Sequence, residues 1–354
     1  MKNKDLNLEH YTIFIDPSLQ RLDDLITKKK YTSIFVLVDE NTKKHCLPKL
    51  PVKAFQLIEI SSGESFKNLQ TCGEIWDFLL KNGADRKSLF INLGGGVIGD
   101  MGGFAASCFK RGMDFINIPT TLLSQVDASI GGKLAIDFKF AKNLIGLFKD
   151  PTAVFISTRF FDTLPTNQFK NGWAEIFKHA LIYNPNLWEE IKSLENLKID
   201  DIERIVIRNL EIKKAVVEID PFEKNLRKIL NFGHTIGHAI ESLSVENDKE
   251  PLLHGEAIII GMICESFLSS KLLNMPQSEL LDICTTLKKH FTEYDLSKIS
   301  LDEVWDIMMY DKKNEDGKIL CVLLEKIGKP IWDITLQKAD VEAAFKYYID
   351  LYEK

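Results

Sequence analysis

The chain has 354 residues, of which 45% are hydrophobic, so it is long enough for two domains with separate cores. A formal net charge of -6 and a pI near 5.8 argue against a nucleic-acid or anionic-membrane surface, but leave room for a local basic pocket that binds an anionic small molecule. Because the cysteines form no C-x-x-C pair, the N-terminus is charged and no apolar run could span a bilayer, we expect a cytoplasmic protein.

The first half of the chain alternates strand and helix signals. Short apolar runs have strand length, and residues 64–81 carry apolar side chains at helical spacing. Such alternation is typical of a parallel, doubly wound α/β sheet. The predicted strands are 11–15, 33–38, 55–60, 88–93, 115–118 and 153–156.

The second half has a different character, with long amphipathic stretches and few strand signals. We therefore place a domain boundary near residue 158, between domains 1–158 and 159–354. A strand pair is expected around 319–324 and 331–334, and a final helix from Ala339. The predicted helices lie near 166–194, 200–219, 230–245, 254–273 and 276–290.

A glycine-rich turn follows the predicted strand 88–93. Gly94, Gly96 and Gly99 fit G-x-G-x-x-G, which lets the backbone approach a pyrophosphate at the start of the next helix, expected over 101–110. The pattern alone is weak. Asp39 at another strand end fits a ribose-hydroxyl acceptor and a solvated strand end equally well. Together the two features favour a nucleotide site.

Residues 119–146 mix hydroxyls, glycines and lysines with many apolar residues. We interpret these polar groups as lining a cleft, with Lys133 and Lys142 as point charges for substrate anions, and a solvated loop as the alternative. Farther on, Glu175 and Lys178 share one helical face. By itself, that spacing is most often a surface ion pair.

Three histidines lie close together in the second half. His234 and His238 have i, i+4 spacing, so a helix would place both on one face, and His254 follows. Gly233 and Gly237 are poor helix formers, which indicates close approach to another helix or a ligand. Histidines that cap and pack a core helix are the alternative, but the third histidine favours a metal or anion site.

As an ordered series, these motifs resemble the 3-dehydroquinate synthase family, the sugar-phosphate cyclases of the shikimate pathway, which leads to chorismate and the aromatic amino acids. The resemblance covers most of the chain, and the series is far more specific than any one motif. The motifs are Gly-Gly-Gly-Val-Ile-Gly-Asp100, Arg111-Gly, Pro-Thr-Thr121, Gln-Val-Asp127, Gly-Gly-Lys133, Lys142-Asn143, Glu175-x-x-Lys178, Asn231-Phe-Gly-His234-Thr-x-Gly-His238 and Leu-His254-Gly-Glu.

The resemblance implies an N-terminal Rossmann-like doubly wound domain that binds NAD, and a mostly α-helical domain that binds zinc or cobalt. The implied metal ligands are Glu175, His234 and His254, a set that leaves coordination positions for two substrate hydroxyls. The implied cofactor contacts are Asp39, Ser62, Gly63, Glu64, Lys67, Gly95, Gly96, Val97, Ile98, Gly99, Asp100, Thr120, Thr121, Lys133, Lys142, Phe160, Phe161, Asp162 and Thr163.

The same resemblance implies a lyase that converts 3-deoxy-D-arabino-heptulosonate 7-phosphate to 3-dehydroquinate and phosphate. Its steps would be transient NAD-dependent oxidation, phosphate elimination, re-reduction and aldol closure. Asp127 and Lys178 would lie beside the reacting hydroxyls, and Arg111 would reach in from the partner subunit of a homodimer. The other implied substrate contacts are Lys142, Lys213 and Arg227 for the carboxylate, and Lys133, Asn143, Asn231, His238 and one of Lys312 or Lys313 for the phosphate.

Two segments depart from the usual family pattern. Leu134, Ala135 and Asp137 stand within the motif Gly-Gly-Lys-Thr-Gly-Ile-Asn, and Pro221 and Asn225 within Asp-Glu-x-Glu-x-Gly-Leu-Arg. Neither departure removes a metal ligand or an anion-binding cation, so we expect altered loops and unaltered chemistry.

Three other functions remain open from the residues. Metal-dependent alcohol dehydrogenases of the same superfamily share the two-domain plan, but they lack this density of cleft lysines. Sister cyclases differ around the substrate carboxylate, so the presence of Lys142, Lys213 and Arg227 favours a carboxylate substrate. A non-catalytic nucleotide-binding or structural-zinc protein would show no turnover.

Overall fold

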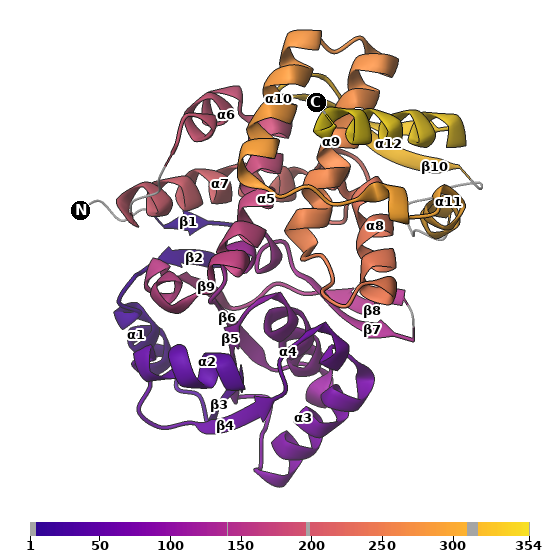
Figure 1. Ribbon diagram of the computed structural model, residues 1–354. Helices are drawn as coiled ribbons and strands as arrows, with labels where there is room; N and C mark the ends of the chain where they lie inside the picture. The colour runs from indigo at the N-terminus through magenta and orange to yellow at the C-terminus, as the bar shows by residue number, and fades with distance from the viewer. Residues whose placement is uncertain (1–4, 140, 196–198, 310–317, 354) are drawn as a thin grey trace. The chain divides into compact units, whose positions relative to one another are not determined.

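The computed structural model describes residues 5–139, 141–195, 199–309 and 318–353, whose helices and strands are drawn in Figure 1. The chain divides into two compact units: unit 1 is Met1–Gly172 with Leu197–Pro221, and unit 2 is Trp173–Asn196 with Phe222–Lys354. The division falls inside helix α5 (Thr166–Tyr183). The sequence analysis placed a boundary near residue 158 between a cofactor-binding and a metal-binding domain, and that boundary stays a prediction.

Unit 1 is built on a mostly parallel sheet. Among the described residues its strand order is β1-β2-β9-β6-β5-β3-β4, and only the pair β1 and β2 is antiparallel. Each strand predicted in the first half is present, with its ends shifted by one residue at most. The strands are β1 (Leu6–Asn7), β2 (Thr12–Ile15), β3 (Ile34–Asp39), β4 (Gln56–Ile60), β5 (Leu89–Gly94), β6 (Asp114–Pro119) and β9 (Ala153–Ile156).

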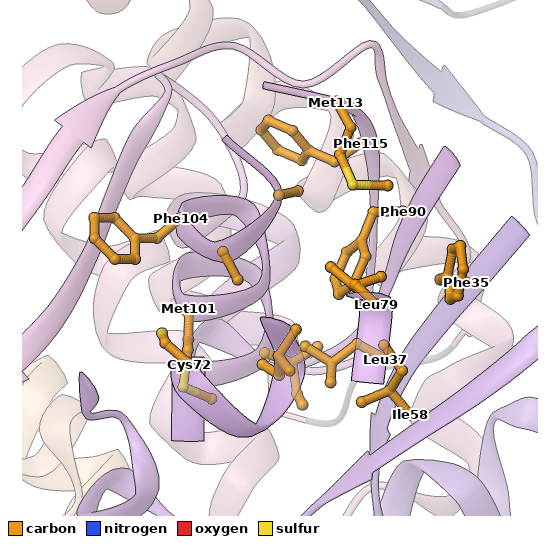
Figure 2. Close-up of a cluster of buried hydrophobic side chains, with 14 of the residues drawn as sticks. Phe35, Leu37, Ile58, Cys72, Leu79, Phe90, Met101, Phe104, Met113 and Phe115 are labelled. Carbon is orange, nitrogen blue, oxygen red and sulfur yellow. The ribbon is translucent and has the colours of Figure 1, made fainter. Parts of the chain in front are cut away.

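Helices cover both faces of this sheet, which confirms the predicted doubly wound α/β fold. In β3, Phe35 and Leu37 pack into the core on one face, shown in Figure 2, while Val36 and Val38 pack on the other. Burying one such side chain contributes about 1.5–3 kcal/mol, and burial on both faces explains the continuous apolar runs. The helices of unit 1 include α1 (Gln20–Lys29), α2 (Glu40–His45), α3 (Leu69–Lys81), α4 (Gly96–Cys108) and α7 (Ile199–Ile219).

A β-hairpin in unit 1 was not predicted. Strands β7 (Lys133–Phe138) and β8 (Ala141–Phe148) pair antiparallel within the stretch that the sequence analysis treated as cleft-lining polar groups. Leu134 and Ile136 join the core with α3 and α4, while Lys133 is exposed. This alternation with a period of two is a strand signal, although the glycines and hydroxyls before it are more typical of a loop.

Unit 2 is mostly helical and is organised around α9 (His254–Leu273), which is buried along most of its length and packs against α8, α10, α12 and β10. In the part of the chain that the structure describes, no helix is long and apolar enough to cross a membrane. Besides α9 and most of α5, unit 2 holds α6 (Pro185–Lys192), α8 (His234–Asn247), α10 (Gln277–His290), α11 (Leu301–Met309), α12 (Lys338–Tyr352) and the antiparallel strands β10 (Ile319–Lys326) and β11 (Lys329–Leu336).

Two predicted helices of this region have different limits. The helix predicted over 166–194 is broken, because Asn184 accepts a hydrogen bond from Leu187 N at 3.0 Å and caps α6, whose first residue is Pro185. The helix predicted over 230–245 starts only at His234. Gly233, the N-cap of α8, has a left-handed φ of 80°. This conformation separates α8 from the preceding 3-10 turn (Leu226–Asn231), so the two do not form one continuous helix.

Candidate active site

The strand order of unit 1 reverses between β3 and β5. From β3 the chain adds β4 on one side, whereas β5, β6 and β9 lie on the other. Loops at the carboxyl ends of strands beside such a reversal are where open α/β sheets bind ligands. Asp39 ends β3 and Gly95 follows β5, so the two features singled out for a nucleotide lie on neighbouring strand ends.

The glycine-rich turn is shorter than predicted, because α4 begins at Gly96 and not near residue 101. The amide groups of Gly96, Val97 and Ile98 therefore belong to the first turn of a helix, where they favour an anion, whereas Gly99 N already donates to Gly95 O at 3.0 Å. Gly102 allows α4 to approach the sheet, since a Cβ there would lie 1.9 Å from Asn92 Oδ1. A small pocket at this turn is lined by Asn92, Gly94, Gly95, Gly96, Gly99, Asn117, Pro119, Ser124, Ala128 and Ser129.

Several other expected cofactor residues also lie at the ends of strands of this sheet or just after them. Asp39 Oδ1 accepts from Thr42 N at 2.7 Å and caps α2, so it is not merely a solvated strand end. Ser62, after β4, donates to the Glu40 carboxylate from N at 2.9 Å and from Oγ at 2.6 Å. Thr120 and Thr121 follow β6, and Phe160, Phe161, Asp162 and Thr163 lie in the 3-10 helix Thr158–Thr163 after β9.

Lys213 of α7 contacts Asp127 within unit 1. Its Nζ donates to Asp127 O at 2.5 Å and to Asp127 Oδ1 at 2.6 Å, and Lys213 is buried. Asp127 lies in the short π-helix Ser124–Ala128, a distortion often found at functional sites. The resemblance assigned Asp127 and Lys213 to different parts of the substrate, but in the structure they are paired. A substrate carboxylate that binds Lys213 would therefore share the Lys213 ammonium group with Asp127.

The remaining expected substrate residues differ in exposure. Lys133, Lys142 and Asn143 are exposed on the β7–β8 hairpin, and Arg111 is exposed in the 3-10 turn Phe109–Arg111 with a φ of 66°. In unit 2, Arg227 is almost fully buried and Asn231 Nδ2 donates to Glu223 Oε1 at 2.7 Å. Lys312 and Lys313 lie outside the described residues.

Glu175, His234 and His254 converge in unit 2. His234 Nε2 lies 3.6 Å from Glu175 Oε1, and His254 Nε2 lies 3.5 Å from the same oxygen. Metal–ligand bonds of about 2.0–2.2 Å place tetrahedral ligand atoms roughly 3.3–3.6 Å apart, so this spacing fits a zinc-sized ion. The predicted ligand set is thus geometrically compatible with a divalent metal.

Both imidazoles have their other ring nitrogen occupied. His234 Nδ1 lies 3.1 Å from the carbonyl oxygen of Phe232, and His254 Nδ1 lies 3.1 Å from Glu241 Oε2. An oxygen acceptor at Nδ1 favours the tautomer that carries its proton there, which leaves the Nε2 lone pair directed at Glu175. Metal-binding histidines are commonly oriented in this way.

The charge of the site also suits a cation. Burial alone would lower the pKa of His254, but the Glu175 and Glu241 carboxylates, which accept its hydrogen bonds and carry negative charge, raise it to about 10. A bound metal would take the place of the proton on Nε2. Lys178 forms an ion pair with Glu175 Oε2, and both side chains are buried. The pair is therefore not the surface ion pair that its spacing alone suggested.

His238 lies beside the same cluster. Its ring centroid is 5.0 Å from that of His234 and 5.7 Å from that of His254. The three imidazoles each offer a ring nitrogen within 4.8 Å of the others, so they too could hold a cation. The expected role of His238 toward a phosphate stays a prediction.

Glycines bring α8 close to α9. A Cβ at Gly261 would lie 1.9 Å from Gly233 O, and one at Gly237 would lie 2.8 Å from Ala257 O. The expectation of close approach at Gly233 and Gly237 is confirmed, and the neighbour is a helix. The fully buried Glu265 of α9 accepts from Gly233 N at 2.6 Å and so fixes the start of α8, which carries His234.

Sequence reasoning missed Glu241 and Glu265, the carboxylates that orient this site. Glu241 lies 13 residues from His254 and Glu265 lies 32 residues from Gly233. A weak signal exists for Glu265, since a carboxylate in an otherwise apolar helix is rarely buried without a partner. Its partner could not be identified without the helix crossing.

Two family models cover most of the chain, 3-dehydroquinate synthase N-terminal over residues 57–171 and 3-dehydroquinate synthase C-terminal over residues 172–314. The chain belongs to the 3-dehydroquinate synthase family. A relative named 3-dehydroquinate synthase from Parabacteroides distasonis is 38% identical over 333 residues, which are 92% of this chain and 94% of the relative. The family predicted from the ordered motifs is confirmed.

Solved structures share the fold of this 3-dehydroquinate synthase family member at lower identity. The 2-epi-5-epi-valiolone synthase from Streptomyces hygroscopicus, with NAD+ and Zn2+ bound, has a TM-score of 0.82 at 24% identity and covers 98% of both chains. NADH-dependent butanol dehydrogenase A from Thermotoga maritima has a TM-score of 0.63 at 15% identity, over 98% of this chain and 99% of its own. These likenesses support the fold alone.

Proposed function

We propose that this enzyme converts 3-deoxy-D-arabino-heptulosonate 7-phosphate to 3-dehydroquinate and phosphate. The observation that carries the proposal is the cluster of Glu175, His234 and His254 in a chain of the 3-dehydroquinate synthase family. In this cluster, the Nε2 atoms of both histidines face Glu175 Oε1. One carboxylate and two imidazoles are a ligand set of catalytic zinc sites that keep positions open for substrate.

NAD and a divalent metal, zinc or cobalt, are the proposed cofactors. The glycine-rich turn and helix start of unit 1, with Asp39 and the neighbouring strand ends, would hold NAD, and Glu175, His234 and His254 would hold the metal. When bound, NAD accepts hydride from an alcohol carbon and the metal polarises hydroxyl oxygens.

The residues of the chain would then bind and orient the substrate. Lys142, Lys213 and Arg227 would bind its carboxylate, while Asp127 and Lys178 would contact the reacting hydroxyls. Oxidation at C5 makes the C6 proton acidic. We propose that the substrate phosphate itself accepts this proton as the C7–O bond breaks, so that Lys133, Asn143, Asn231 and His238 orient the phosphate.

A second candidate is a sister cyclase, which would keep the metal and NAD sites. The two cyclase activities differ in whether the substrate carries a carboxylate. The cations Lys142, Lys213 and Arg227 support the carboxylate substrate.

We further propose a cytoplasmic homodimer. The reduced cysteines support the compartment, since free thiols with no disulfide are typical of cytosolic proteins. Exposed Arg111, assigned by family resemblance to the substrate phosphate of a partner subunit, supports the dimer.

Phosphate release tests the proposed function. The enzyme with NAD and zinc or cobalt should release one phosphate per molecule of 3-deoxy-D-arabino-heptulosonate 7-phosphate and form 3-dehydroquinate, and should act poorly on a heptulose 7-phosphate that lacks the carboxylate. A reversed preference would support the sister cyclase. No turnover of either sugar phosphate would overturn the proposal.

A further inference from the structure

Lys67 is a buried lysine that joins three segments of unit 1. It follows β4 and the 3-10 turn Glu64–Phe66, and only 4% of its surface is exposed. Its Nζ donates to Asp100 Oδ2 at 2.8 Å and to Asn143 Oδ1 at 2.6 Å. One ammonium group therefore ties the loop after β4 to the first turns of α4 and to the β7–β8 hairpin.

Asp137 holds the same part of the hairpin through the backbone. Its N donates to Lys67 O at 2.8 Å, and its Oδ1 accepts from Asn143 N at 2.7 Å. The pairing of β7 with β8 shifts register between Ile136 and Phe138, which places Asp137 at an irregularity. Asn143 has a left-handed φ of 51°, a conformation that Asn tolerates better than most residues. Such irregularities redirect a particular side chain.

The charges around Lys67 fix which atom of the Asn143 amide faces its ammonium group. Burial would lower the pKa of Lys67, but the charges of Asp100 and Glu64, the hydrogen bond to Asp100 and the charge of Asp137 raise it above its ordinary value. Lys67 thus stays protonated, and an ammonium group only donates. The atom of Asn143 that faces it must be the carbonyl oxygen, so the Nδ2 group, which carries the N–H donors, is turned away from Lys67.

We propose that Lys67 and Asp137 are positioning residues that present the amide N–H groups of Asn143 to the substrate phosphate. This inference rests on the proposed function and deepens it, because Lys67 was expected only as a cofactor contact. It also gives a role to Asp137, where the family commonly has Asn. Both side chains carry an oxygen that can accept from Asn143 N, so the departure keeps the contact.

The test measures inorganic phosphate binding to the NAD-loaded enzyme by calorimetry. Asn143→Ala and Asp137→Ala should each weaken phosphate binding about 10-fold, since a charge-assisted contact is lost or misdirected. The double variant Asn143→Ala with Asp137→Ala should bind phosphate no more weakly than Asn143→Ala alone, because both changes act on one contact. Asp137→Asn, which keeps an oxygen acceptor, should bind phosphate with a Kd within about 2-fold of that of the parent. Asp137→Ala should leave the Kd for NAD unchanged.

Lys67→Met probes the ammonium group directly. It should weaken phosphate binding without adding to the effect of Asn143→Ala, and the Asp137 variants decide the matter if this variant fails to fold. Parent-like phosphate binding by Asp137→Ala, or losses that multiply in the double variant, would overturn the inference. Turnover of the parent enzyme is scored separately, so an inactive parent refutes the proposed function, whereas an active parent with a neutral Asp137→Ala refutes the positioning role alone.

Discussion

Glu241 determines which ring nitrogen of His254 is available to a metal, because its Oε2 lies 3.1 Å from Nδ1. Glu241→Gln removes the negative charge while keeping an acceptor of similar shape. We expect zinc affinity to fall about 10-fold, as is usual when the outer partner of a metal-binding histidine is changed.

Glu250→Gln is the matched control, since it makes the same charge change at an exposed position of unit 2. Competition of the apoprotein with a chelator for zinc measures both variants. Equal zinc affinity in Glu241→Gln and Glu250→Gln would show that Glu241 does not orient His254.

His234→Ala should remove a metal ligand while leaving the core of unit 1 folded. Metal content and turnover should both fall by more than about 100-fold, beyond the loss expected for an outer partner. His10→Ala, at an exposed histidine, should change neither. Elemental analysis and circular dichroism check the result, and full metal content in His234→Ala would exclude this ligand set.

Local spacing predicts individual site residues only when their partners are near in sequence. The pairs Glu175 with Lys178 and His234 with His238 could be recognised from their spacing along a helix. Glu241 and Glu265 could not, because each acts across the crossing of α8 and α9, and exposure cannot be read from spacing. For that reason the Glu175 and Lys178 pair was first interpreted as a surface pair, although both are buried.

The crossing of α8 and α9 depends on residues without side chains. Gly261→Ala should lower the melting temperature of the protein, because its Cβ would lie 1.9 Å from Gly233 O. Overpacking of this kind costs about 1–3 kcal/mol or more. Since α8 carries His234, zinc affinity should fall as well.

Gly73→Ala provides the contrast, because it lies in α3 and a Cβ there would meet nothing within 4 Å. It should stabilise the protein by about 0.5–1 kcal/mol through the helix preference of alanine. Calorimetric melting compares the two variants. A Gly261→Ala protein as stable as the parent would mean that the helices separate without penalty.

At the scale of elements, burial on two faces made the strands of unit 1 predictable, since such strands are continuous apolar runs. The β7–β8 hairpin was missed because it follows glycines and hydroxyls and only Leu134 and Ile136 of β7 reach the core. Helix limits were wrong at Asn184 and Gly233, where a cap and a left-handed glycine override the apolar periodicity.

At the scale of the whole molecule, variants of Arg111 test whether two subunits share an active site. Arg111→Ala should lose phosphate affinity, because a charge-assisted contact of about 1.5–3 kcal/mol disappears. If Arg111 acts across a two-fold dimer, mixing inactive Arg111→Ala with inactive His234→Ala should restore about a quarter of the parent activity through hybrid dimers. No recovery, when subunit exchange is demonstrated, would count against the shared site.

The family and fold class of the whole chain were predictable, because many weak motifs in a fixed order are jointly specific. The pairing of Lys213 with Asp127 and of Lys67 with Asn143 was not, since these contacts span 86 and 76 residues of sequence. Motif order therefore predicts which residues belong to the site, and the structure shows which of these residues contact one another.

The central claim is a reaction with no net redox change, in which hydride removed from C5 returns to it after phosphate leaves. The direct test supplies substoichiometric NAD with excess 3-deoxy-D-arabino-heptulosonate 7-phosphate and follows phosphate release together with absorbance at the NADH band. We expect many phosphates released per NAD and no steady rise in NADH. NADH that accumulates one-for-one with substrate consumed would make this protein a dehydrogenase and contradict the cyclase account.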